Sequence, residues 1–294
     1  MARLTGAMPA IVTPFKGGEV DLPALQALVE WQLAEGASGI VACGTTGEGA
    51  TLSGEETLAV ARACAEVIGG RAPLIVGSGS NDTARTVALT QALAEQGQVD
   101  AALVVTPYYN KPSPAGVKAH YGAVAAQGGL PVLMYNVPGR TGLNMSVEAI
   151  VECGQIPGVI GVKEASAELD KALLIRQAMG ADFTLLSGDD FTILPFLACG
   201  GDGVITVVGN VAPGPTARLI AAFQEGALAE AQALQARLLP LIQALFVEAN
   251  PIPVKHALAA QGRLELEYRL PLVPPSPGAA AKVDAAWRAF EGAA

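Results

Sequence analysis

Eight short apolar runs recur along this chain of 294 residues, and segments with the character of helices separate them. They occupy residues 8–13, 39–43, 73–78, 101–106, 131–136, 158–163, 184–188 and 203–208. The first seven runs start 26 to 34 residues apart, which leaves room for a strand, two loops and a helix; the last follows after 19. Because their apolar residues are nearly continuous rather than alternating, the runs are typical of parallel strands covered on both faces.

The segments between the runs carry start signals of helices. Ser53 precedes Glu56 by three residues, which is a capping box, and Asp21 precedes a segment with proline near its first turn. Asn81 or Asp82 can cap the helix that follows them. Eight β/α units in series predict an α/β fold, a (β/α)8 TIM barrel. A doubly wound sheet is the alternative, but such sheets usually stop at five or six strands.

After residue 223 the pattern changes to helices joined by proline-rich turns, "NPIPV" and "RLPLVPPSP". We therefore expect a barrel over residues 1–225 and a C-terminal helical extension over residues 226–294.

Composition and charge exclude several classes of protein. A net charge of −9 and a pI near 4.8 argue against nucleic-acid binding, which requires basic stripes. The chain is 51% hydrophobic, yet no apolar run approaches the roughly 18 residues that a membrane span needs. The start, "MARLTGAMPA", lacks the apolar core of a signal peptide, so we expect a cytoplasmic protein without a membrane partner. Such apolar richness also suits helices buried between the subunits of an oligomer.

Metal and disulfide sites are not expected. The four cysteines are far apart without a CxxC pair, which favours reduced residues in the core, and two histidines make a histidine-based metal site improbable. Asp189 and Asp190 have no further ligand nearby in sequence, so we interpret them as a helix cap. "GSGS" at residues 77–80 lacks the third glycine of a dinucleotide-binding loop.

Polar, glycine-rich and tyrosine-rich residues concentrate where the predicted strands end, which is where barrel enzymes place their active sites. The segments are "GTTGE" (44–48), "GSGSND" (77–82), "TPYYNK" (106–111), "YNVPGRT" (135–141), "VKEAS" (162–166), "SGDD" (187–190) and "VVGN" (207–210). Tyr108, Tyr109 and Tyr135 are three of only five tyrosines in the chain, and all three lie in these segments.

Lys163 ends the buried run "GVIGVK" and is followed by Glu164. Enclosure in a low-dielectric barrel disfavours the charged ammonium form, and a neutral amine condenses with a ketone or aldehyde to give an imine. A protonated imine withdraws electrons, so that a neighbouring carbon loses a proton and becomes a nucleophilic enamine. This is class I aldolase chemistry, which needs neither metal nor cofactor. The alternative is a lysine that is solvated or paired with Glu164.

The neighbouring segments supply groups that suit this chemistry. The hydroxyls of Tyr135, Thr46 and Tyr109 could form a proton shuttle above Lys163, although each alone could equally serve packing or a turn. The amides and hydroxyls of "GTTGE" suit a small carboxylate, and Arg140 could bind a second one unless it forms a surface ion pair.

The motifs "GTTGE", "TPYYNKP", "YNVPGRT", "GVKEAS" and "SGDD" together resemble those of the pyruvate-dependent class I aldolases of the dihydrodipicolinate synthase and N-acetylneuraminate lyase family. The resemblance covers nearly the whole chain and is strongest to the synthase branch. It implies that Lys163 forms the imine with pyruvate and that Tyr135 is the main proton-transferring hydroxyl. Thr46 would link Tyr135 to Tyr109, which in this family reaches the site from a neighbouring subunit.

The resemblance also implies residues that hold the substrates. Thr45 and Thr46 would bind the carboxylate of pyruvate, and Arg140 would anchor that of L-aspartate 4-semialdehyde. Gly188 and Ile205 would contribute main-chain groups around Lys163. The implied pathway is lysine and diaminopimelate biosynthesis, and the implied assembly is a homotetramer built from tight dimers.

In many members of the family, lysine inhibits by binding a cleft between subunits beside Asn81 and Tyr108. Lysine-sensitive members tend to carry a carboxylate where this chain has Arg85, and an arginine repels the ammonium groups of lysine. We therefore expect weak or absent inhibition by lysine.

Three other functions remain open from the residues. They are a pyruvate aldolase acting on a sugar acid or hydroxy acid, a non-catalytic barrel that binds a keto acid, and a metal-dependent aldolase.

Overall fold

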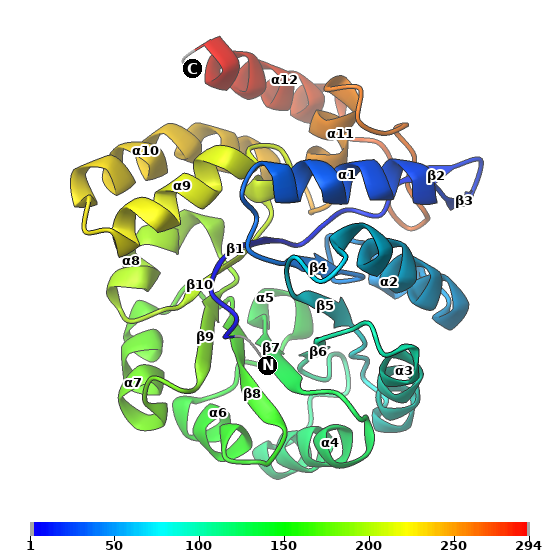
Figure 1. Ribbon diagram of the computed structural model, residues 1–294, viewed down its shortest axis with the longest axis vertical. Helices are drawn as coiled ribbons and strands as arrows, with labels where there is room; N and C mark the ends of the chain where they lie inside the picture. The colour runs from blue at the N-terminus through cyan, green and yellow to red at the C-terminus, as the bar shows by residue number, and fades with distance from the viewer. Residues whose placement is uncertain (1–2, 293–294) are drawn as a thin grey trace.

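The computed structural model describes residues 3–292, and a barrel of eight parallel strands surrounded by helices forms its core (Figure 1). The strands are β1 (Gly6–Pro9), β4 (Ile40–Ala42), β5 (Leu74–Gly77), β6 (Ala101–Val105), β7 (Val132–Asn136), β8 (Val159–Glu164), β9 (Thr184–Ser187) and β10 (Gly203–Thr206). Neighbours in the sheet run from β4 in chain order through β10 to β1, and a parallel bridge between Ala10 and Val41 closes the circle. Each strand overlaps one predicted apolar run, so the predicted TIM barrel is confirmed.

Helices cover the outside of the barrel. They are α1 (Leu22–Ala34), α2 (Gly54–Ile68), α3 (Thr83–Gln96), α4 (Pro114–Gln127), α6 (Val147–Gly154), α7 (Leu169–Met179), α8 (Ile193–Ala198) and α9 (Pro213–Gln224). Ser53 and Glu56 form the expected capping box at α2, Asp21 accepts a hydrogen bond from the Ala24 amide at α1, and Asp82 caps α3. These caps satisfy amide groups that have no partner within the helix.

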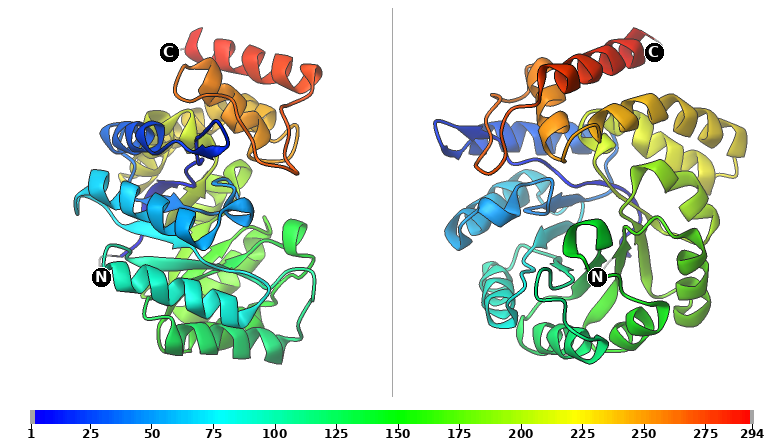
Figure 2. Two further views of the ribbon diagram at one scale, coloured as in Figure 1. Left: turned by 90° about the vertical axis from the view of Figure 1, so that its right-hand side faces the viewer. Right: turned by 180° about the vertical axis from the view of Figure 1, so that it is seen from behind.

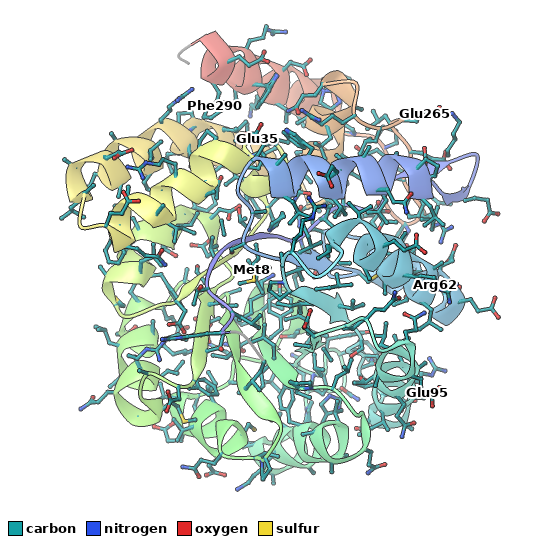
Figure 3. The ribbon with its side chains drawn as sticks, in the orientation of Figure 1. Met8, Glu35, Arg62, Glu95, Glu265 and Phe290 are labelled. Carbon is teal, nitrogen blue, oxygen red and sulfur yellow. The ribbon has the colours of Figure 1, made fainter. Side chains whose placement is uncertain are left out.

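Residues alternate along each strand between the barrel interior and the helix layer. On β7, Leu133 and Tyr135 belong to the interior cluster, whereas Val132 and Met134 pack with the outer helices. Met8 lies fully buried in the interior (Figure 3). Burying such a side chain stabilises the fold by about 1.5–3 kcal/mol, and burial on both faces explains why the strands are apolar without alternation.

Beyond the barrel, α10 (Leu228–Leu245), α11 (Ile252–Ala260) and α12 (Pro277–Gly292) form a helical layer along one side. Figure 2 shows α11 and α12 stacked beyond α1, with the loop between them descending beside the strands β2 (Phe15–Lys16) and β3 (Glu19–Val20). An ion pair of 2.5 Å between Lys16 and Glu265 joins that loop to β2. The β2–β3 hairpin was not predicted, because two-residue strands leave no periodic signal. None of the helices described has the length and apolar character needed to cross a lipid bilayer.

Two further features lie over the carboxyl ends of the strands. The short helix α5 (Pro138–Thr141) follows β7 and lies across the barrel in the rear view of Figure 2. Three 3₁₀ turns follow or lie close to the ends of β4, β9 and β10. They are η1 (Gly49–Thr51), η2 (Asp190–Thr192) and η3 (Val208–Asn210). These connections surround the end of the barrel at which the sequence motifs lie.

Candidate active site

Lys163 is the lysine of the barrel interior. It occupies β8 on the same face as Gly161 and opposite Val162, which packs with the outer helices, and only 6% of it is exposed. Across the described residues, the lysines with a carboxylate partner are Lys16, Lys118, Lys171 and Lys255, and Lys163 is not among them. The Lys163 amine thus lies in the barrel interior with no carboxylate of the described residues held against it.

Glu164 is not the partner of Lys163. Its carboxylate accepts hydrogen bonds from the Asn136 side chain at 2.9 Å and from the Ser166 amide at 2.7 Å. Because neighbouring residues of a strand point to opposite faces, Glu164 lies in the layer outside the barrel. The structure therefore removes the ion-pair alternative that the sequence left open.

Tyr135 lies beside Lys163 in the sheet. The two residues are register partners on β7 and β8, and Lys163 Nζ is 4.2 Å from the centroid of the Tyr135 ring. Tyr135 is 6% exposed, so the barrel holds its phenol ring against the amine. This places a hydroxyl-bearing side chain within reach of any carbonyl compound that Lys163 binds.

The loop after β9 packs directly on Lys163. A β-carbon at Gly188 would lie 2.8 Å from Lys163 Cε and 2.7 Å from the Ala165 β-carbon, so only glycine fits without a shift. The Gly188 amide donates to the Glu164 carbonyl at 2.7 Å, which holds this loop against β8. Ile205, on β10, is buried in the same interior cluster as Tyr135.

The loop "GTTGE" presents polar groups at the end of β4. Thr46 is buried and Thr45 is half-buried, and the loop folds back through a bond from the Glu48 amide to the Thr45 carbonyl. Among residues 3–292, no acceptor pairs with the amides of Thr45, Thr46 or Gly47. Adjacent amides without partners are the groups that bind small carboxylates.

Asn250 is a site residue that the sequence interpretation missed. Its side-chain amide donates to Thr46 Oγ1 at 2.9 Å, and its carbonyl accepts from Arg140 Nη2 at 3.1 Å. Arg140 lies on α5 and is otherwise exposed, so Asn250 joins the two predicted carboxylate-binding segments. The motif "NPIPV" was visible in the sequence, but it lies in the extension and not at a strand end.

The other two tyrosines of the predicted site, Tyr108 and Tyr109, do not enter the barrel of their own chain. Tyr109 is 88% exposed and has a left-handed backbone with φ of 71°, which is unfavourable for a residue with a side chain. Tyr108 is 37% exposed, and Asn110, two residues further along, donates from its side chain to the Asn81 carbonyl at 2.9 Å. Tyr108 and Asn81 therefore belong to neighbouring loops on the surface of a single chain.

Arg85 points into solvent near the same loops. Its side chain is 84% exposed, and its Nε lies 3.5 Å from the Asp82 carboxylate on the preceding turn. An exposed pair of this kind leaves the positive charge available to repel cations.

The interpretation of Asp189 and Asp190 as a helix cap is wrong. Asp189 precedes η2, but its carboxylate accepts from the Thr192 hydroxyl rather than from a helix amide. Asp190 is buried, accepts from the amides of Val207 and Val208, and so anchors the turn after β10. Burial raises the pKa of Asp190 to about 6, even though these amides and Thr206 favour its charged form.

The cysteines are core residues with free thiols, as expected. Cys43 and Cys64 are buried in the main core cluster, and burial raises the pKa of Cys64 to about 12. A thiol with so high a pKa is uncharged at neutral pH and therefore a poor nucleophile.

Comparison with known proteins gives one consistent result. Residues 3–289 match the model of the dihydrodipicolinate synthetase family. A relative from Maridesulfovibrio salexigens, named 4-hydroxy-tetrahydrodipicolinate synthase, is 49% identical over 97% of both chains. The synthase of that name from Methylacidiphilum fumariolicum SolV superposes with a TM-score of 0.96 at 39% identity, covering 99% of this chain and 97% of its own. A structure described as the first monomeric dihydrodipicolinate synthase variant gives 0.94 at 41%, covering 98% and 97%.

Proposed function

This chain belongs to the dihydrodipicolinate synthetase family, and from that premise we propose that it is a 4-hydroxy-tetrahydrodipicolinate synthase. It condenses pyruvate with L-aspartate 4-semialdehyde and serves lysine and diaminopimelate biosynthesis. The observation that carries the proposal is Lys163: a buried amine in the barrel interior, without a carboxylate partner among the described residues and 4.2 Å from the Tyr135 ring.

The reaction begins when Lys163 Nζ attacks the keto carbon of pyruvate. Loss of water gives the imine, and loss of a methyl proton gives the enamine, whose carbon attacks the aldehyde. The aldehyde oxygen takes up a proton and becomes the hydroxyl of the product. The amino group of the semialdehyde portion then attacks the imine carbon, which closes the ring and releases Lys163 as the free amine.

Tyr135 transfers protons during imine formation and release, because its ring lies against the amine. Thr45 and Thr46, with the free amides of their loop, hold the carboxylate of pyruvate. Gly188 and Ile205 shape the space around Lys163 with their main chains. Arg140, held by the Asn250 carbonyl, binds the carboxylate of the semialdehyde, since a guanidinium forms two parallel hydrogen bonds to a carboxylate.

Tyr109 acts in the site of a neighbouring subunit. An aromatic side chain that is 88% exposed in its own chain is one that a partner is suited to cover. Thr46 then relays the proton between Tyr135 and the partner's phenol. We propose an assembly of tight dimers paired into a homotetramer, located in the cytoplasm. The barrel domain ends near residue 225, and the extension over residues 226–294 supports the site through Asn250.

Two measurements on the purified protein test the function. Turnover of pyruvate with L-aspartate 4-semialdehyde is followed through the cyclic product and compared with turnover of sugar-acid substrates. Borohydride reduction in the presence of pyruvate is followed by mass spectrometry of the peptide that contains Lys163. We expect the cyclic product and a pyruvate adduct on Lys163. An adduct with preferred turnover of a sugar acid would make the chain a different aldolase, and absence of the adduct would refute the imine mechanism.

A further inference from the structure

A buried ion pair joins the carboxylate-binding loop to the C-terminal extension. Glu48, the last residue of "GTTGE", lies 2.6 Å through its Oε1 from Nζ of Lys255, which belongs to α11 and is 207 residues away in sequence. The side chains of Glu48 and Lys255 are 1% and 0% exposed. Neither residue has a role in the chemistry derived above.

The backbone of Glu48 shows that its side chain is needed there. Glu48 is left-handed, with φ of 53° and ψ of 32°, a conformation that favours glycine. Both neighbours are glycines in close contact with the chain: a β-carbon would lie 3.0 Å from the Ile11 carbonyl oxygen at Gly47 and 2.1 Å from that of Cys43 at Gly49. A third glycine would suit this turn better than glutamate, so the carboxylate must serve a purpose of its own.

That carboxylate is fully engaged by the extension. Its second oxygen accepts from the Arg269 amide at 3.3 Å, and Lys255 Nζ lies 4.3 Å from the centroid of the Phe15 ring. Burial lowers the pKa of Lys255, and the charge of Glu48 opposes that effect. Because desolvation offsets much of the attraction in a buried pair, its advantage over an apolar contact is that it specifies one position.

The extension therefore contacts two residues of the loop, Thr46 and Glu48, which are separated only by Gly47. Asn250, just before α11, donates to Thr46, and Lys255, within α11, pairs with Glu48. Asn250 also accepts from Arg140, so one segment of the extension sets the relative positions of both carboxylate-binding groups.

We propose that Glu48 and Lys255 are positioning residues, which hold the loop amides and Thr46 in the geometry that binds the carboxylate of pyruvate. They touch no substrate and act through Thr45, Thr46 and Gly47. The inference rests on the proposed function and adds to it how pyruvate affinity is determined. Loss of the pair weakens pyruvate binding more than it slows the later steps, because Lys163 and Tyr135 belong to strands that the pair does not contact.

The test compares Lys255→Met and Glu48→Gln with the double variant Glu48→Gln/Lys255→Met. Each single variant leaves one charge buried and weakens the pair, whereas the double variant removes both charges as well as the ionic contact. We expect each single variant to raise KM for pyruvate about 10-fold or more while kcat falls less than about 3-fold. The double variant should recover thermal stability relative to Lys255→Met and keep the raised KM.

Arg176→Met is the matched control. Arg176 forms a partly buried pair of 2.9 Å with Asp202, which precedes β10 and so lies at the opposite end of the barrel. This variant should lower thermal stability but leave KM for pyruvate within about 2-fold of native.

The outcomes are distinct. KM that returns to the native value in the double variant, or unchanged KM in folded single variants, overturns the positioning role. If Lys255→Met does not fold, Glu48→Gln and the double variant decide the question in the same way. A native protein that neither turns over pyruvate nor forms the borohydride adduct refutes the proposed function itself, before any variant is compared.

Discussion

Gly188 and Lys163 are in contact at the mouth of the barrel, where Lys163 lies near the end of β8 and Gly188 follows the neighbouring strand β9. The space for one β-carbon at Gly188 is already taken by Lys163, whose Cε would be 2.8 Å away, and by the Ala165 β-carbon at 2.7 Å. Gly188 has no positive φ, so its conformation suits other residues and the constraint is steric alone. The backbone of Gly188 therefore restricts the position of the Lys163 side chain.

Gly188→Ala should displace the amine rather than unfold the barrel. The flexible end of Lys163 can yield, and a displacement near 1 Å costs about 100-fold in rate when reacting groups must align. We expect borohydride trapping with pyruvate to slow by about that factor. The melting temperature should fall as well, because the Ala165 β-carbon, 2.7 Å from the added carbon, cannot turn aside. Gly122→Ala, where nothing lies within 4 Å of the added carbon, is the control and should behave as native. Equal trapping rates in the two variants would contradict the steric role.

Lys163→Ala should abolish turnover while the protein stays folded. The substitution removes the nucleophile, so activity should fall by at least about 10³-fold. It also removes a buried amine without a carboxylate partner in the described residues, so the free energy of unfolding should change by less than about 1 kcal/mol. Urea unfolding and the coupled assay check both expectations, with the exposed Lys118→Ala as control. A variant that is inactive because it does not fold would return Lys163 to a structural role.

Tyr109→Phe should slow turnover by about 10²-fold, the usual contribution of a proton-transferring group. If its hydroxyl acts in the partner's site, then mixing with Lys163→Ala restores activity. Half of the dimers in an equal mixture combine the two variants, and each has one complete site, so about one quarter of native activity should return. The measurement is activity after the two variants are unfolded and refolded together. No recovery in verified mixed dimers would place Tyr109 in its own chain's site or outside the reaction.

Free lysine at sub-millimolar concentration should inhibit weakly or not at all. The exposed guanidinium of Arg85 lies on the turn that follows Asn81 and repels the ammonium groups of lysine. Arg85→Glu should increase inhibition, because it supplies the opposite charge. Initial rates measured against lysine concentration check both. Strong inhibition of the native enzyme would show that Arg85 does not prevent lysine from binding.

His120 should make stability depend on pH. Burial lowers the pKa of His120 to about 4, and Nδ1 of its ring is 2.9 Å from the Thr83 hydroxyl. The unfolded chain titrates near pH 6.5, so it takes up the proton first as the pH falls. His120 therefore contributes full stability above about pH 6.5 and loses it down to pH 4, by about 3 kcal/mol in total.

The comparison of native protein with His120→Gln isolates this effect. Urea unfolding at pH 8 and pH 5 should show a loss of about 2 kcal/mol for the native protein that the variant lacks. Parallel losses in the two proteins would mean that other groups govern acid sensitivity.

Local sequence was sufficient wherever local forces decide the structure. Burial on two faces produces continuous apolar runs, so the eight strands could be predicted, and Lys163 could be placed at the end of one of them. Capping is equally local, since Ser53 and Glu56 or Asp21 and Ala24 are only three residues apart. Grouping of polar residues at strand ends then identified Tyr135, Thr46 and Arg140 as candidates.

Tertiary structure decided what depends on distant segments. The Asn250 contacts with Thr46 and Arg140 and the pairing of Lys255 with Glu48 arise only when α11 packs against the closed barrel, and no periodicity links residues 204 or 207 positions apart. The partners of Glu164 were likewise undecided and those of Asp190 were predicted wrongly, because a carboxylate binds whichever donors the fold brings near. Local sequence patterns therefore predict the order of the strands and the type of chemistry. The partners of individual polar groups follow only from closure of the sheet, because closure excludes water and each buried polar group must then form a hydrogen bond within the protein.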